Sequence, residues 1–142
     1  MYQAHYLGQT GEEAALNYLK DNGYSIRQQN WRYRRIEVDI IAETPQYLVV
    51  VEVKSRRNTL FTDPYKAVNY AKVRRLVNAA HAYVQRYSIA KEVRFDIIEV
   101  VSTANGFAIN HIADAFVPPR RVVRHLINAV PELVERRPQF GG

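Results

Sequence analysis

The hydrophobic pattern of the chain is strongest between residues 36 and 54. An apolar stretch from Ile36 to Ile41 and a second from Leu48 to Lys54 are both rich in β-branched residues, a composition typical of strands. The polar residues 44–46, which include a proline, separate the two stretches and are typical of a turn. The pattern therefore predicts a hairpin at the centre of the fold.

Charged side chains are embedded in this hairpin. Alternate side chains of a strand share a face, so Glu52 lies beside Lys54 and Glu37 beside Asp39. If the two strands pair, Asp39 meets Glu52 and Lys54 at one end of the sheet, and carboxylates in an apolar setting must be neutralised, paired or bound to a cation. The alternative is a solvated sheet face with cross-strand charge pairs. The unbroken apolar run before Glu52 favours a functional site, because such runs mark central strands.

The rest of the pattern predicts an α/β fold, in which helices flank a mixed central β-sheet. We expect one domain over residues 1–142, with its core at about 8–115 and a basic C-terminal helix and frayed tail at about 118–142. The other elements expected are a loose arm over 1–9, a helix over 10–22, a strand over 24–31, a basic turn over 32–35, a polar loop over 55–63, a long helix over 64–87, a strand over 93–101, an edge strand over 107–113 and a short basic helix over 120–130.

Two charged residues border the apolar stripes of the predicted helices. In the first helix the stripe of Ala15, Leu16 and Leu19 extends back to Glu12, which therefore faces the core. The alternative for Glu12 is a first-turn carboxylate that complements the helix dipole. In the long helix, Lys72 either points toward the same site as the hairpin charges or extends from the stripe into water.

Composition narrows the classes of function. The absence of cysteine excludes disulfides and thiolate metal sites, and no signal-peptide pattern or membrane-length apolar run is present, so we expect a cytoplasmic protein without a membrane partner. The net charge of +6 comes largely from clustered arginines, which favours nucleic acid as the partner, although basicity of this size also occurs without such a partner. The candidate contacts are Arg34, Arg35, Arg56, Arg57 and Arg75.

The carboxylates of Glu12, Asp39 and Glu52 are hard oxygen ligands, and the four histidines are scattered along the chain. Such ligands suit Mg²⁺ or Mn²⁺ better than a structural zinc ion. An ion held in this way polarises a phosphodiester and activates water. Lys54, on the same face as Glu52, could orient that water or stabilise the developing charge. The pattern therefore indicates phosphodiester hydrolysis.

These residues also carry a family resemblance. Asp39 followed by Glu52-Val53-Lys54 resembles the Asp…Glu-x-Lys signature of the PD-(D/E)XK nuclease superfamily. Over about residues 8–115 the chain resembles the YraN-like family of small bacterial proteins, which is related to archaeal Holliday-junction resolvases. The wider pattern consists of Gly11-Glu12, Ala15, Tyr18-Leu19, Gly23-Tyr24, Asn30-Trp31-Arg32, Glu37-x-Asp39-Ile40-Ile41-Ala42, Val51-Glu52-Val53-Lys54, Lys72 and Arg94-Phe95-Asp96.

The resemblance implies a restriction-endonuclease-like core, in which Glu12, Asp39 and Glu52 bind the metal, Lys54 is the catalytic lysine and Lys72 supports it. It implies a Mg²⁺-dependent endonuclease acting on DNA, including branched DNA, and a homodimer, because paired cuts need two sites. Two departures stand out. Ile36 replaces the glycine common in the family, which puts the local turn in doubt, and Val38 replaces the proline of the superfamily name.

Two other functions remain open on the sequence. A nucleic-acid-binding module could keep the fold and the basic surface without hydrolysis, and it would bind DNA in a steeply salt-dependent way. A structural protein could use the same basic surface for an acidic protein partner. Resemblance in fold does not by itself decide among these functions.

Overall fold

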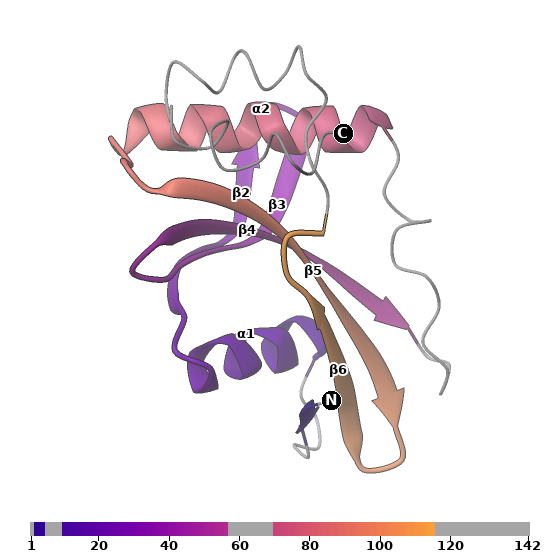
Figure 1. Cartoon of the computed structure of the whole chain (residues 1–142). Coiled ribbons are helices and arrows are strands. Elements are labelled where there is room, and N and C mark those ends of the chain that lie inside the picture. The colour runs from indigo at the N-terminus through magenta and orange to yellow at the C-terminus, as the bar shows by residue number, and fades with distance from the viewer. Residues whose placement is uncertain (1, 5–9, 57–69, 116–142) are drawn as a thin grey trace, which may run out of the picture.

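The computed structural model describes residues 2–4, 10–56 and 70–115, and it has the predicted α/β architecture (Figure 1). A six-stranded mixed sheet has the strand order β1-β6-β5-β4-β3-β2, with α1 on one face and α2 on the other. The elements are β1 Tyr2–Ala4, α1 Gly11–Asp21, β2 Ser25–Tyr33, β3 Ile36–Glu43, β4 Tyr47–Arg56, α2 Tyr70–Arg86, β5 Glu92–Thr103 and β6 Gly106–Ile112.

The sheet is built around its one parallel pair. β4 and β5 run parallel over ten residue pairs, from Tyr47↔Glu92 to Arg56↔Val101, and α2 lies between them in the chain. The other neighbouring strands are antiparallel. A central parallel pair is covered on both faces, which explains why most positions of β4 and β5 are buried, including some that carry charged side chains. The predicted hairpin of β3 and β4 is confirmed, and it places β4 in the middle of the sheet.

Each face of the sheet carries its own core. α1 packs on the face that contains Ile40, Val49, Val51 and Ile98, whereas α2 packs on the face that contains Ile41, Val50 and Phe95, as Figure 1 shows for the two helices. The alternating positions of β4 therefore supply both cores, as strand periodicity requires. The predicted stripe of α2, from Val73 to Val84, is buried in the second core. No helix within the described ranges is long and apolar enough to span a membrane.

The ends of α1 follow the capping signals in the sequence. Thr10 is the N-cap, and its Oγ1 accepts a hydrogen bond of 3.1 Å from the backbone N–H of Glu13. Gly23, just beyond the C-cap Asn22, has a φ of +87°. Glycine adopts this left-handed conformation without a Cβ penalty, so the chain can reverse into β2.

Two of the predicted elements were wrong. Residues 1–9 were expected to form a loose arm, but Tyr2–Ala4 form β1 and pair with β6. The strand over residues 107–113 is consequently not an edge strand. A three-residue strand leaves no periodic pattern in the sequence, and it forms because its partner offers unpaired backbone groups.

Several element boundaries also differ from those expected. β2 continues to Tyr33, so the turn consists of Arg34 and Arg35 alone, and β4 continues to Arg56 instead of ending at Lys54. Both strands run on because their partner strands offer backbone groups to pair with. The start of the long helix at Pro64, most of the polar loop and the basic C-terminal helix over 120–130 lie outside the described residues.

Candidate active site

The candidate site begins where β3 and β4 separate. Their regular pairing runs from Glu43↔Leu48 to Ile40↔Val51 and stops one residue short of Asp39. The Oδ2 atom of Asp39 accepts a hydrogen bond of 2.8 Å from the backbone N–H of Val53. The Asp39 carboxylate thus satisfies a backbone donor of β4 beyond the last paired residues and is held in one orientation.

The backbone of β3 is irregular at the same position. Val38 and Ile41 are three residues apart, which in a regular strand places them on opposite faces, yet both belong to the core beneath α2. On the neighbouring strand Asn30, which lies between Gln29↔Ile40 and Trp31↔Val38, has a φ of +50°. The irregularity thus coincides with Asp39, whose side chain bonds to the backbone of β4.

The replacement of glycine by Ile36 does not disturb this geometry. Ile36 pairs with Tyr33 in the ladder, and its φ is not positive. The left-handed residue of the two-residue turn is Arg34, with a φ of +57°. No position that requires glycine therefore falls on residue 36, and the hairpin entry accommodates a β-branched side chain.

Glu52 lies at the centre of the charged groups. Its side chain is buried, with 7% of the residue exposed, and two lysines contact the same oxygen. The Nζ atoms of Lys72 and Lys54 lie 2.5 Å and 3.3 Å from Oε1 of Glu52. The prediction that Lys54 shares a face with Glu52 is therefore confirmed, and Lys72 on α2 points to this site.

Glu12 approaches from the opposite helix. Gly11 lies so close to β4 that a Cβ in its place would contact Oγ of Ser55. This close approach brings the first turn of α1 to the end of β4, and Glu12 acts electrostatically on Asp39. Oε1 of Glu12 is buried without a hydrogen-bond partner among the described residues, whereas Glu13 is exposed. The predicted orientations of the two glutamates are confirmed.

The pKa of Asp39 is shifted by its surroundings. Burial above all, together with the negative charges of Glu52 and Glu12, raises the pKa of Asp39 to about 6 against the opposing effects of the Val53 N–H and of Lys72. This Asp39 carboxyl group is therefore close to the midpoint of its titration near neutral pH. A bound cation would relieve the same repulsion.

The pKa values of the two lysines are shifted in opposite directions. Burial lowers the pKa of Lys54, and the neighbouring ammonium of Lys72 lowers it further. Burial also opposes the charged form of Lys72, but hydrogen bonds to Glu52 and Lys54 outweigh it and raise its pKa. Lys72 thus remains the fixed positive charge of the pair, and Lys54 is the lysine that more readily exchanges a proton.

The donor set fits a divalent cation in its chemistry. Glu12, Asp39 and Glu52 offer only carboxylate oxygens, one of them buried and unpaired, which suits Mg²⁺ or Mn²⁺. As the side chains stand, no three acidic or histidine residues of the described chain are gathered closely enough to hold an ion. Lys72 occupies Oε1 of Glu52, so an ion would have to replace this contact.

Known protein families match the part of the chain that carries the candidate site. A family model described as "Uncharacterised protein family UPF0102" matches residues 11–100, the span from α1 to the middle of β5. The chain belongs to this family. A UPF0102 protein of Bacteroides thetaiotaomicron is 48% identical over 84% of this chain and 98% of its own length, and one of Phocaeicola vulgatus is 45% identical with the same coverage. The predicted resemblance to the YraN-like family is thereby confirmed.

One solved structure also resembles this UPF0102 chain weakly. The structure titled "Crystal structure of SSO0001" is 14% identical, with 83% of this chain and 55% of that chain covered and a TM-score of 0.33. This similarity is too low to carry an argument about fold or function.

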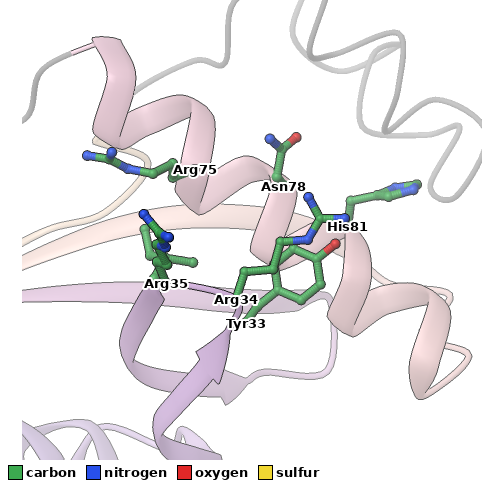
Figure 2. A pocket seen from close by; sticks show the side chains of 7 residues that line it. Tyr33, Arg34, Arg35, Arg75, Asn78 and His81 are labelled. Carbon is green, nitrogen blue, oxygen red and sulfur yellow. The ribbon is translucent and has the colours of Figure 1, made fainter.

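The predicted nucleic-acid contacts of the UPF0102 chain do not form one group. Arg34, Arg35 and Arg75 line a common cavity (Figure 2). Arg56 is instead paired with Glu99 of β5, with 2.9 Å between its Nε and Oε2 of the glutamate. Arg57 lies outside the described residues. Three of the predicted arginines thus lie together at one cavity, whereas Arg56 lies elsewhere and is paired with a buried carboxylate.

Glu99 is a residue that the sequence reasoning missed. It is fully buried on β5 directly opposite Lys54, and its Oε1 has no hydrogen-bond partner among the described residues. The signal was present, since Glu99 is an acidic residue between the apolar pairs Ile97-Ile98 and Val100-Val101 of the predicted strand, much as Glu52 follows the apolar residues of its own strand. The pairing with Arg56 could not be seen, because it depends on the parallel register of β4 and β5.

A second missed group lies beneath α1. Asp96 on β5 receives two hydrogen bonds from Arg94, of 2.9 and 2.7 Å, and its Oδ2 lies 2.7 Å from Nε2 of His111. The other ring nitrogen of His111 lies 2.9 Å from the hydroxyl of Tyr18. This chain of contacts attaches α1 to β5 and β6, and so fixes the helix that carries Glu12.

Proposed function

We propose that the chain is a metal-dependent phosphodiester hydrolase that acts on nucleic acid, with DNA as its substrate. The observation that supports this most strongly is the convergence of Glu12, Asp39 and Glu52, with Lys54 and Lys72, at the separation of β3 and β4. The order of these residues is that of the nuclease signature to which the chain is similar, and the mixed α/β sheet is consistent with a restriction-endonuclease-like core.

Each residue has a distinct part in the proposed reaction. Glu12, Asp39 and Glu52 would hold Mg²⁺ or Mn²⁺, which when bound polarises the phosphodiester and lowers the pKa of an attacking water. Asp39 is oriented by the N–H of Val53. Lys72 retains its charge beside Glu52 and would stabilise the charge that develops on the phosphate oxygens.

Lys54 is the residue best placed to move a proton. Its ammonium is partly buried near Glu52, and burial has lowered its pKa. An amine with a lowered pKa exchanges its proton more readily near neutral pH, which is what a general acid or base requires. In its neutral amine form, which the lowered pKa makes more accessible, Lys54 would orient the attacking water and take up its proton at Nζ.

A nucleic-acid-binding module without hydrolysis is the second candidate. The observation that favours it is the ion pair of Lys72 and Glu52, which already satisfies a buried carboxylate oxygen without a metal ion. In that case the lysines would serve the stability of the fold, and the basic surface would bind DNA alone.

The experiment combines metal binding with cleavage. Mg²⁺ and Mn²⁺ are titrated calorimetrically into the wild type, Asp39→Ala and Glu52→Ala, in the absence and presence of DNA, and each protein is then incubated with branched and linear DNA. We expect loss of metal binding and cleavage in both variants. Unchanged cleavage by both would refute the site, whereas salt-dependent DNA binding without any product at all metal concentrations would identify the binding module.

The two adjacent glutamates of α1 provide a matched control. Glu12→Gln and Glu13→Gln remove the same charge from neighbouring positions, but only Glu12 faces the site. We expect weaker metal binding and slower cleavage from Glu12→Gln, with Glu13→Gln behaving like the wild type. Equal effects of the two substitutions would indicate a general effect of charge on the helix instead of ligation.

A further inference from the structure

A cavity of about 480 Å³ lies between the turn of β2 and β3 and the outer side of α2 (Figure 2). Its volume is within the range of about 300–1,000 Å³ that is typical of small-molecule sites. Beside Ile36, six polar or aromatic residues line it, and they are Tyr33, Arg34, Arg35, Arg75, Asn78 and His81. This group is called the arginine cavity below.

The charge of the arginine cavity is wholly positive. None of its lining residues is acidic, and within the described residues Arg34, Arg35 and Arg75 have no carboxylate partner. Four other arginines of the described chain do have such a partner, namely Arg27, Arg32, Arg56 and Arg94. Guanidinium groups from the turn and from the helix thus line one cavity, and this lining suits a phosphate, which arginine binds through paired hydrogen bonds.

An aromatic surface lies beside these charges. The ring of Tyr33 stacks on Trp31 with an interplanar angle of 7° and a centroid distance of 6.2 Å, and both residues pack against the core beneath α2. The Arg34 guanidinium lies 5.2 Å from the Tyr33 ring centroid. The Tyr33 ring and the Arg34 guanidinium over it together offer flat surfaces of the kind on which unpaired bases stack.

The arginine cavity adjoins the carboxylate site. On α2, Arg75 follows Lys72 by three residues, which places the two side chains on neighbouring turns of the same side of the helix, about 4.5 Å apart along its axis. Lys72 contacts Glu52. On β3, Ile36 lines the cavity three residues before Asp39. The cavity and the carboxylate site thus use residues only three positions apart on both α2 and β3, so a strand bound at one can extend to the other.

We propose that the arginine cavity binds a single unstacked nucleotide of the substrate strand. Its phosphate lies on Arg34, Arg35 and Arg75, its base lies against Tyr33, and Asn78 offers both a donor and an acceptor to the base edge. This inference rests on the proposed function, since the strand in the cavity is the one that would be cut. It specifies substrates with unpaired nucleotides beside the cut, such as flaps and junctions, because a continuous duplex would first have to unstack a base.

The binding test uses dAMP and inorganic phosphate, titrated calorimetrically into the metal-free wild-type protein. We expect dAMP to bind about tenfold more tightly than phosphate, since stacking of one base contributes about that factor or more. Trp31 is the only tryptophan of the chain and stacks on Tyr33, so its emission should change with dAMP and not with phosphate. Equal affinities for the two ligands, or no binding of dAMP, would overturn the proposal.

Variants locate the bound nucleotide. Arg75→Ala removes an exposed cavity arginine, and Arg86→Ala removes an exposed arginine of the same helix that does not line the cavity. We expect Arg75→Ala to weaken dAMP binding at least fivefold and Arg86→Ala to leave it unchanged. Tyr33→Leu, which keeps apolar bulk, should reduce dAMP affinity to that of phosphate. Equal loss in both arginine variants would mean general electrostatic attraction and would contradict the proposal.

Failure of the cavity and failure of the hydrolase can be told apart. Asp39→Ala should bind dAMP as the wild type does, because Asp39 does not line the cavity. Specific dAMP binding without cleavage of any DNA would support nucleotide binding in the cavity and would refute the proposed hydrolase activity. Cleavage that is equally fast on flap and continuous duplex DNA, and unaffected by Arg75→Ala, would keep the hydrolase and reject the cavity.

Discussion

The ammonium of Lys72 on α2 lies 2.5 Å from Oε1 of Glu52 on β4. This contact joins the helix to the central strand. It also places the positive charge of Lys72 beside the carboxylate that is proposed to bind a metal ion. Lysine and metal ion would therefore compete for Glu52, and the occupancy of the site depends on which of the two is present.

Replacement of Lys72 tests this competition. We expect Lys72→Met to bind Mg²⁺ about tenfold more tightly, because Glu52 is released and a nearby positive charge is removed. Cleavage should nevertheless slow, because the fixed charge beside the phosphate is lost. Calorimetric titration and a cleavage assay measure the two effects, with Lys20→Met, an exposed lysine of α1, as the control. Weaker metal binding by Lys72→Met would contradict the competition.

The Asp39 carboxylate should lower the stability of the metal-free protein. Its pKa of about 6 lies above the ordinary value of 3.8, so the folded protein binds an extra proton between these values and loses stability as the pH rises through this window. In the presence of a chelator, Asp39→Asn should therefore be more stable than the wild type at pH 8, by about 1–3 kcal/mol. Asparagine can still accept the hydrogen bond from Val53.

Urea unfolding at pH 8 and pH 5 measures this difference. It should shrink at the lower pH, where the Asp39 of the wild type is mostly protonated. The exposed Glu37, two residues away, provides the control substitution Glu37→Gln. A variant less stable than the wild type at pH 8 would show that the carboxylate supports the fold instead of straining it.

Asp96 should have the opposite pH dependence. Burial alone would raise its pKa, but hydrogen bonds from His111, Arg94 and the N–H of Asp114 outweigh burial and hold the pKa below the ordinary value. A lowered pKa adds stability that is present above the unfolded pKa of about 4 and is lost as the pH falls toward the folded pKa.

The substitution Asp96→Asn separates this contribution from the rest of the protein. It should lower the free energy of unfolding by about 3–5 kcal/mol at pH 7, because it leaves the buried Arg94 without its charged partner. The variant should also lose less stability than the wild type between pH 5 and pH 3. Denaturant midpoints across this range measure both effects, and parallel pH profiles of the two proteins would argue against the assignment.

The contact between Tyr18 and His111 should stabilise the attachment of α1. Tyr18→Phe removes only the hydroxyl that lies 2.9 Å from Nδ1 of His111, and we expect a loss of about 1 kcal/mol in the free energy of unfolding. Tyr87→Phe, which removes a hydroxyl from a residue that is 39% exposed, should change it much less. Equal losses of stability from the two substitutions would show that the contact between Tyr18 and His111 does not stabilise the fold.

Local features of the fold were readable from the sequence. The N-cap Thr10, the left-handed Gly23 and the turn between β3 and β4 depend on neighbouring residues only, and each was predicted. The charged positions of β4 followed from strand alternation in the same way. The strand β1 was missed because it exists only through its pairing with β6.

The candidate site itself was partly predictable. The sequence by itself determined that Asp39, Glu52 and Lys54 share one region, since two adjacent strands joined by a short turn must pair closely. It also determined that Glu12 faces inward, through the periodicity of α1. These inferences rest on short-range geometry, which a chain cannot avoid once its secondary structure forms.

Only the tertiary structure decided which charges meet across distant segments. The contact of Lys72 with Glu52, the pairing of Arg56 with Glu99 and the arginine cavity all join elements that are separated along the chain. Their partners depend on the parallel register of β4 and β5, on the rotation of α2 over the sheet and on the separation of β3 and β4 at Asp39. These quantities are set by the packing of the whole core, and no local pattern of residues encodes them.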